Sequence, residues 1–187
     1  MLAVALLAVL SFASTPSSEA TEIALALSAA PRDLRSTAGV WVRTRSGYHQ
    51  ARRGSNGLQC IVAQETSATL EPQCYDADSA ATLLPIDVYR RERQMLGENT
   101  AAVDRDVRAR YADRTFRPPR AGDIVYMLSN DNYVLVSAGR VVHFAPHLMI
   151  TAPFKRVDAL GGANRYAFLI HEGEPDALII IRVDDSH

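Results

Sequence analysis

The chain opens on an unbroken apolar run, Leu2–Leu10, which passes into a looser stretch of small and polar residues. Such a run is too short to cross a bilayer as a stable helix and is typical of the apolar core of a signal peptide. Small residues at Ser11-Phe12-Ala13 and at Ser18-Glu19-Ala20 each fit a processing site, so residues 1–20 are assigned to a cleaved signal peptide. No basic residue precedes Arg32, and we therefore expect translation to start further upstream.

Three β-rich runs follow, with turn-forming residues between them. They are Val40–Thr44, Tyr48–Arg53 and Leu58–Gln64, separated by Ser46-Gly47 and by Gly54-Ser55-Asn56-Gly57. An Asn-Gly pair between β-rich runs favours a hairpin, because both central positions of the turn accept positive φ. The pattern predicts a three-stranded antiparallel meander.

Helical periodicity appears near the N-terminus and again in the middle of the chain. The Ala/Leu-rich stretch Glu22–Ala30 predicts a short helix. Pro85 fits the first turn of a central helix, and Gly97 fits its C-terminal stop. Asn99 is the expected N-cap of a second helix, whose buried face carries apolar residues four apart: Val103, Val107 and Tyr111. The sequence thus predicts a two-helix insert over residues 85–117.

After the insert the chain returns to β-rich runs. Alternation and turn residues predict strands at 123–129, 133–137, 140–144, 166–171 and 177–183. The run Leu178–Ile181 lacks alternation, which predicts a central strand buried on both faces. Together these patterns predict an α+β fold: a mostly antiparallel mixed sheet with a two-helix insert, in a single domain that spans residues 21–187.

The charged residues argue against nucleic acid as a partner. The formal net charge is −1 over 187 residues, and every basic residue except Lys155 is arginine. Arginines are dense in the insert, but aspartates and glutamates interleave with them, which predicts an ion-paired, solvated helical face. We also expect no stable membrane span after signal cleavage, because no other segment is long and apolar enough.

Cys60 and Cys74 are the two cysteines of the chain. In an exported protein the oxidising compartment favours a disulfide between them. A thiolate metal site would lack the usual Cys-x-x-Cys spacing, and a pair of buried, inert thiols is the remaining alternative. The pattern predicts a disulfide-bonded protein in the periplasm or outside the cell.

Histidine and methionine residues are candidates for a metal site. His143 and His147 lie four residues apart, but Pro146 argues against a helix there, so the geometry of a helical metal pair cannot be assumed. Imidazoles with a carboxylate would suit zinc, and imidazoles with methionine would suit copper. The alternative is that both residues are structural histidines, hydrogen-bonded at strand ends. Further candidate ligands are His49, His171, Met127 and Met149.

Two carboxylates are candidates for proton transfer. Glu71 would serve if it shared a cleft with His143, and Glu172 would serve beside the predicted metal. The alternative assigns Asp76 or a neighbouring aspartate to the cap of a short helix over residues 79–83, and pairs Glu71 with an arginine.

Three segments of the chain carry a resemblance to other proteins. They are Leu70–Asp76, Tyr126–Ser129 and His143–Met149. At these segments the chain resembles a set of exported bacterial proteins that are described only as hypothetical, and the resemblance would cover most of the mature chain. It implies an exported domain and carries over no activity, cofactor or functional residue.

Sequence signatures of several enzyme classes are absent, including Gly-x-Ser-x-Gly, a glycine-rich phosphate loop and His-Glu-x-x-His. We therefore expect a non-catalytic envelope or ligand-binding domain that exposes a pocket or a sheet edge near residues 143–153. One alternative is a metal-dependent, hydrolase-like enzyme in which three imidazoles hold the metal and a carboxylate moves the proton. The other is a copper-binding protein that adds the two methionines. Both alternatives use His143, His147 and His171.

Overall fold

The computed structural model describes residues 19–136, 139–162, 164 and 166–183. Its elements run in the order α1 (Glu19–Ser28), η1 (Arg32–Thr37), β1 (Gly39–Thr44), β2 (Gly47–Arg52), β3 (Gln59–Ala63), β4 (Glu71–Tyr75), α2 (Ala77–Thr82), α3 (Leu84–Met95), α4 (Thr100–Ala112), β5 (Ile124–Met127), β6 (Tyr133–Val136), β7 (Arg140–His143), β8 (His147–Thr151), η3 (Val157–Leu160), β9 (Ala167–Ile170) and β10 (Leu178–Arg182). No helix within the described ranges is long and apolar enough to cross a membrane.

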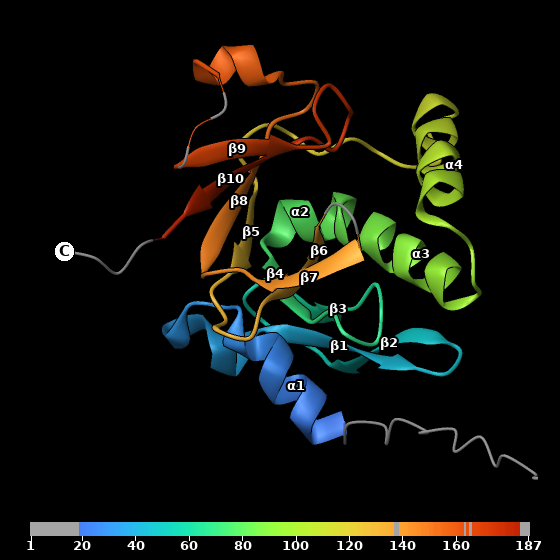
Figure 1. Cartoon of the computed structure of the whole chain (residues 1–187). Helices are drawn as coiled ribbons and strands as arrows, with labels where there is room; N and C mark the ends of the chain where they lie inside the picture. The colour runs from blue at the N-terminus through green and yellow to red at the C-terminus, as the bar shows by residue number, and fades with distance from the viewer. Residues whose placement is uncertain (1–18, 137–138, 163, 165, 184–187) are drawn as a thin grey trace, which may run out of the picture.

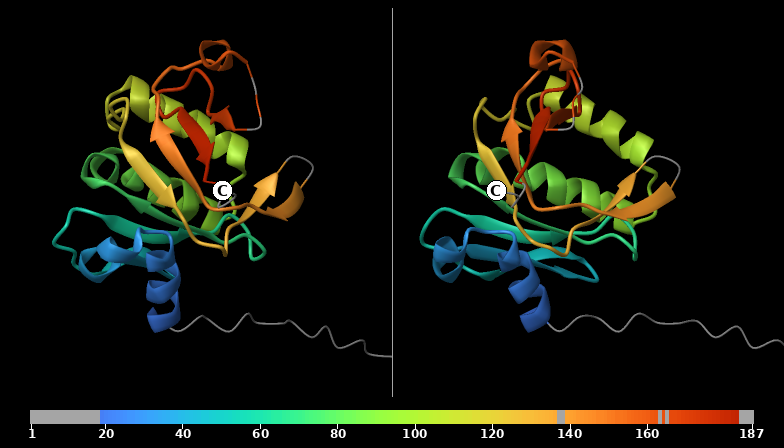
Figure 2. Two further views of the ribbon diagram at one scale, coloured as in Figure 1. Left: turned by 90° about the vertical axis from the view of Figure 1, so that its left-hand side faces the viewer. Right: turned by 60° about the vertical axis from the view of Figure 1, so that its left-hand side comes forward.

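Eight of the strands form one mixed sheet in the order β2-β1-β3-β4-β5-β8-β10-β9 (Figure 1). Every neighbouring pair is antiparallel except β1 and β3. Strands β6 and β7 form a separate ribbon, which a Leu70–Tyr133 bridge joins to the residue before β4. Figure 2 shows this ribbon as an arm beside the main sheet. The predicted fold class, α+β with helices in the middle of the chain, is confirmed.

The expected three-stranded meander is wrong in one pairing. Strands β1 and β2 form the predicted hairpin, but β3 pairs with β1, in parallel, and not with β2. The loop 54–57 is therefore a crossover and not a turn. Asn56 holds it against the preceding segment by donating its side-chain amide to the Leu34 carbonyl at 2.9 Å. A side chain at Gly54 would collide with the backbone nitrogen of Gly39, so glycine permits this close passage.

Strand β8 was not predicted, because the strand expected before it ends at residue 144 and the next one begins at residue 166. The strand begins at His147, directly after the proline, and lies between β5 and β10. Proline has no amide hydrogen to donate, but its carbonyl still accepts a hydrogen bond from the Val183 amide at 3.2 Å. The proline thus precedes the strand instead of interrupting it.

Strand β10 is central in hydrogen bonding but not in burial. It pairs with β8 on one side and β9 on the other, as expected of a central strand. Leu178 and Ile180 are buried, whereas Ile179 and Ile181 are only half-buried. The expectation of burial on both faces is therefore wrong. Helix α1 packs against β1, β3 and β4 on that face and does not extend over this half of the sheet.

Both central helices form as the sequence predicts. Pro85 lies in the first turn of α3, and the Asn99 side chain accepts a hydrogen bond from the Ala102 amide at 2.9 Å at the start of α4. The apolar face of α4 is buried against Ile86 and Phe116. A third, short helix, α2, precedes them and is capped by Asp76, which accepts from the Ser79 amide at 2.8 Å. The cap predicted for Asp76 is confirmed.

The N-terminal helix belongs to the folded core. It begins at Glu19, earlier than the expected Glu22, and its Ala26 is fully buried, as are Ala29 and Ala30 just beyond it. These residues pack on the face of β3 and β4 opposite to the central helices. The signal peptide prediction lies outside the described residues except for its last two positions. Cleavage after Ala20 would remove only the first two residues of α1.

The predicted disulfide between Cys60 and Cys74 is confirmed, with an S–S distance of 2.05 Å. The two residues are register partners on the antiparallel strands β3 and β4. Both side chains are fully buried beneath α1. The bond therefore ties two central strands together inside the core.

Replacing both cysteines, in Cys60→Ala/Cys74→Ala, should lower the free energy of unfolding by about 3 kcal/mol. A cross-link that closes a loop of this length removes conformational entropy from the unfolded chain, and the variant restores it. Urea unfolding at pH 7, followed by circular dichroism, measures the loss. Wild-type protein unfolded in a reductant is the control and should lose a similar amount. A loss below about 1 kcal/mol in both samples would contradict the prediction.

Candidate functional site

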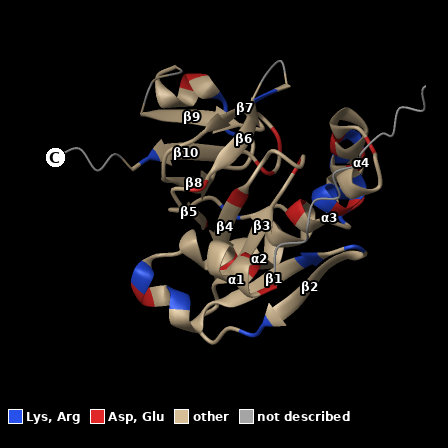
Figure 3. Cartoon of the chain, turned by 60° about the horizontal axis from the view of Figure 1, so that its bottom comes forward, with Lys and Arg blue, Asp and Glu red and all other residues tan. Residues whose placement is uncertain are grey.

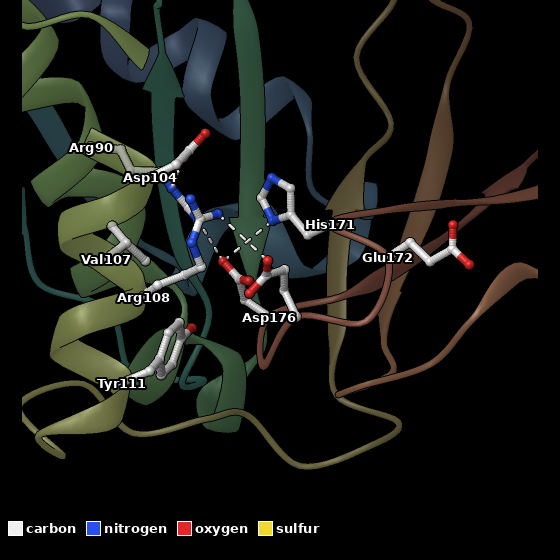
Figure 4. A pocket seen from close by; sticks show the side chains of 9 residues that line it. Arg90, Asp104, Val107, Arg108, Tyr111, His171, Glu172 and Asp176 are labelled. Atoms are coloured by element: carbon white, nitrogen blue, oxygen red, sulfur yellow. Dashed lines mark hydrogen bonds and ion pairs between the residues drawn. The ribbon is translucent and has the colours of Figure 1, made fainter. Parts of the chain in front are cut away.

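A cleft is lined by the helices α3 and α4, by one face of the sheet and by the segment between β9 and β10. It has two lobes of about 220 and 190 Å³. The lobes share Arg90 from α3, Asp104 from α4 and His171, which follows β9. Figure 4 shows these three side chains converging in the first lobe. The cleft does not coincide with the pocket expected near residues 143–153, of which only Met149 lines it.

The floor of the second lobe is the apolar face of the sheet. Alternate positions on β5, β8, β9 and β10 share this face because strand side chains point to opposite sides in turn. One polar residue, Gln73 from β4, lies among them and is 6 % exposed. Its side-chain amide has no hydrogen-bond partner within the described part of the chain. The apolar floor residues are Val125, Met127, Met149, Ile170 and Leu178.

The guanidinium of Arg90 lies at the centre of the cleft wall. Its side chain is 13 % exposed and faces three aspartates. The distances are 2.7 Å to Asp176, 3.6 Å to Asp87 and 3.6 Å to Asp104. Burial would lower the pKa of Arg90, but the three carboxylates outweigh burial and raise it. The group is therefore a permanent buried cation.

A second buried arginine, Arg91, forms ion pairs with two glutamates that line the cleft. Its guanidinium lies 3.5 Å from Glu71 and 3.8 Å from Glu65. Burial raises the pKa of Glu71, and Arg91 opposes that effect. The predicted alternative for Glu71, an arginine partner, is confirmed. Among the described residues Glu71 faces Arg91, whereas His143 contacts the Asn130 carbonyl, so no hydrogen bond joins Glu71 to His143 for proton transfer.

Asp176 and His171 form a pair at the junction of the two lobes. The imidazole Nδ1 lies 3.3 Å from the carboxylate, whose side chain is 4 % exposed. Burial alone would raise the pKa of Asp176, but the contacts with His171 and Arg90 hold it well below its usual value. The backbone of His171 has a φ of 52°, in the left-handed region that residues other than glycine seldom adopt. This conformation turns the imidazole toward the cleft (Figure 4).

The hydroxyl of Tyr111 is another buried polar group in the first lobe. It has no hydrogen-bond partner among the described residues. Burial, together with the charges of Asp176 and Asp87, raises the pKa of Tyr111 far above its usual value, so the phenol stays neutral. The wall thus combines charged groups that are paired with one hydroxyl that is not.

The three imidazoles predicted to bind a metal are not brought together. His147 pairs with Arg182 at one end of β10, whereas the residue before His171 pairs with Leu178 at the other end. At about 3.3 Å per strand residue, these ends are more than about 10 Å apart. His143 lies on the separate ribbon, where its Nε2 is 2.7 Å from the Asn130 carbonyl. Within the described ranges no three His, Cys, Asp or Glu side chains are placed to hold a metal ion.

The remaining candidates also have other roles. Met127 and Met149 are buried in the sheet core and form part of the cleft floor. His49 is exposed on β2, the strand at one edge of the sheet. Glu172 accepts a hydrogen bond from the Val157 amide at 2.9 Å, and Figure 4 shows it pointing away from the Arg90 cluster. The zinc and copper hypotheses therefore gain no geometric support.

Sequence patterns did not identify the charged wall. They predicted that the insert's arginines would be solvated, and Figure 3 does show mixed charges along α3 and α4. Half-exposed pairs such as Arg110 with Asp106 fit that expectation, but Arg90 and Arg91 are largely buried. A usable indication was the helical spacing: Arg90 lies four residues after the fully buried Ile86, and so on the same face.

No family model, curated protein or solved structure matches this chain. The interpretation of the cleft therefore rests on its geometry, burial and charge. The resemblance to exported hypothetical proteins stays a prediction.

The variant Asp176→Asn should lower the free energy of unfolding at pH 7 by about 3 kcal/mol, because it leaves Arg90 buried with one carboxylate fewer. The pKa of Asp176 is depressed in the folded protein, so the stability it adds is complete above its unfolded pKa of about 4. The difference between wild type and variant should therefore hold from pH 7 to about pH 4 and shrink in stronger acid. Urea unfolding over this range measures it.

The matched control for that variant is Glu174→Gln. Glu174 forms an ion pair with Arg108 at 3.5 Å, but both side chains are well exposed. Its loss should cost less than about 0.5 kcal/mol. Equal effects of the two variants would contradict a structural role for the buried cluster.

His147 should make the protein less stable as the pH falls from 7 to 5. The ring is 3 % exposed, and Nδ1 lies 2.9 Å from the Ala145 carbonyl. Burial lowers the pKa of His147, so the unfolded chain binds a proton that the folded protein does not. The resulting decrease in the free energy of unfolding is at most about 2 kcal/mol at pH 5.

Thermal unfolding of wild type and His147→Asn at pH 8, 7 and 5 tests this prediction. The difference between the two proteins should be the same at pH 8 and 7 and should change at pH 5, where wild type loses more. A constant difference at all three pH values would show that the ring is not held neutral.

Proposed function

We propose that this protein is an exported, disulfide-bonded domain that binds a small molecule in the cleft between the central helices and the sheet. One observation carries the proposal: Gln73, which is only 6 % exposed, places a polar side chain on the otherwise apolar floor of the second lobe. A ligand that enters the lobe can hydrogen-bond to this side chain while it covers the apolar floor.

The apolar N-terminal run and the disulfide support the location. The run Leu2–Leu10 has the length and composition of a signal peptide core. The disulfide lies in the protein core, and such bonds form and persist in oxidising compartments. A periplasmic or extracellular location agrees with both features.

The composition of the cleft supports binding of a small molecule. Its floor is formed by aliphatic and thioether side chains, while polar groups occupy the wall and one point of the floor. Ligand sites typically combine an apolar surface with a few polar groups that fix orientation. Each lobe is smaller than a drug-sized pocket, which favours a small ligand.

The lining favours binding over covalent catalysis. No serine or cysteine from the described residues lines either lobe. Thr100 is a lining hydroxyl, but it donates to Glu65 at 3.2 Å instead of facing a base. His171 and Asp176 form a pair, but no serine, threonine or cysteine among the described residues is hydrogen-bonded to it. These features support the ligand-binding interpretation more than the metal-dependent hydrolase or the copper protein.

Native mass spectrometry of untagged protein from a periplasmic preparation tests the proposal. Wild type should carry a non-covalent adduct of a small molecule, either as isolated or after incubation with an extract of small metabolites. The variant Ile170→Trp should lose it, because the indole fills the second lobe. The matched control is Ile179→Trp, which adds the same side chain on the opposite face of the sheet and should keep the adduct.

An adduct that persists in Ile170→Trp would contradict the proposed site. Absence of any adduct from wild type, both as isolated and after incubation with the extract, would contradict the function. The intact mass of the same sample also shows whether the chain was processed after Ala13 or Ala20.

A further inference from the structure

The cleft concentrates negative charge. Its two lobes are lined by seven carboxylates and three guanidiniums, which gives a net charge of −4 with His171 neutral. The whole chain has a net charge of only −1. A recess in which one sign of charge is in excess attracts ligands of the opposite sign. The carboxylates are Glu65, Glu71, Asp87, Asp104, Glu172, Glu174 and Asp176, and the guanidiniums are Arg90, Arg91 and Arg108.

The arginines do not offer an anion site. Arg90 and Arg91 together face five of the carboxylates. Their Nε atoms have no hydrogen-bond partner in the described part of the chain, but they are shielded from solvent and out of a ligand's reach. Arg108 lies at the mouth of the cleft, where it pairs with Glu174 at 3.5 Å. An acidic ligand would therefore meet more carboxylates than free guanidinium groups.

Asp104 is the carboxylate best placed to receive a ligand. Its side chain is 37 % exposed and lines both lobes. The one ion pair of its carboxylate among the described residues is the 3.6 Å approach to Arg90, which is too long for a hydrogen bond. Arg90 is shared with two other aspartates, so the charge of Asp104 is incompletely compensated. Its oxygens remain available to a donor in the cleft.

Gln73 points independently to a ligand with an apolar body. Its amide lies among the floor residues, more than nine-tenths buried and without a partner in the described ranges. Only a molecule that enters the second lobe can reach it. Such a molecule must cover Met127, Met149 and Ile170, and an apolar surface does so favourably.

We infer that the ligand is an organic cation, a protonated amine or guanidine attached to an apolar body. The cation donates to Asp104 at the junction of the lobes, and the apolar body lies on the floor beside Gln73. An organic cation fits better than a metal ion, because no three metal-ligating side chains converge in the described structure. The inference rests on the proposed function and adds the chemical class of the ligand.

Three probes with one skeleton and different charge test the inference. They are phenethylamine, phenethyl alcohol and phenylacetate, titrated into the mature wild-type protein at pH 7 and low ionic strength. Two-dimensional amide NMR gives both the dissociation constant and the location of binding. Phenethylamine should bind in the cleft at least about tenfold more tightly than the alcohol, because a charged hydrogen bond is worth that factor or more. Phenylacetate should bind more weakly than the alcohol.

The variant Asp104→Asn should weaken phenethylamine binding about tenfold and leave the alcohol unchanged. The matched control is Asp33→Asn, which removes the same charge from an exposed position on η1, outside the cleft lining. It should leave both affinities within about twofold of wild type, because separated surface charges are screened. Equal weakening by both variants would overturn the role of Asp104.

The remaining outcomes separate this inference from the proposed function. Equal affinities for amine and alcohol, both lost in Ile170→Trp, would overturn the cation preference and leave ligand binding intact. Tightest binding of phenylacetate would do the same. No response to any probe, with a native adduct still present, would overturn the inference alone. No probe binding and no adduct would overturn both.

Discussion

The buried guanidinium of Arg90 is the contact on which the placement of the helical insert depends. Its partners come from three parts of the chain: Asp87 on α3 itself, Asp104 on α4 and Asp176 just before β10. An uncompensated buried charge costs several kcal/mol, so these segments cannot separate without a large loss of stability. The single side chain thereby fixes how far the helices stand from the sheet, and with it the width of the cleft.

The cleft stays open because the side of α3 that faces the sheet is apolar at its beginning and charged further along. At its beginning, Leu84 and Val88 pack directly on the sheet with Tyr75. Further along, the same side of the helix carries Arg90 and Arg91, whose long side chains end in charged groups held by carboxylates. Charged groups cannot be pressed onto an apolar floor without desolvation, so the helix and the sheet leave a gap there. The change from apolar to charged residues along one helix thus creates the cleft.

Local patterns predicted the helices and the disulfide because these depend on neighbouring residues. Caps such as Asn99 act within one turn, and the cysteine pair needs only a hairpin-sized separation. The β1–β3 pairing was not predictable, because a crossover and a turn use the same glycines. The Arg90–Asp176 contact joins residues 86 apart, so no local spacing reveals it. The positions of the histidines were not predictable for the same reason: His143 lies on the β6–β7 ribbon, whereas His147 and His171 lie near opposite ends of β10.

Strand β4 carries both a cysteine of the disulfide and residues that line the cleft. Its side chains alternate, so Cys74 points toward α1 while Glu71, Gln73 and Tyr75 point toward the helical insert. Tyr75 donates to Asp87 at 2.8 Å, and Asp87 in turn faces Arg90. The disulfide fixes the register of β4 against β3 from the opposite face. Since one strand carries both the cross-link and Gln73, the disulfide also helps to position the polar group on the cleft floor. The disulfide and the cleft therefore lie on opposite faces of the same strand.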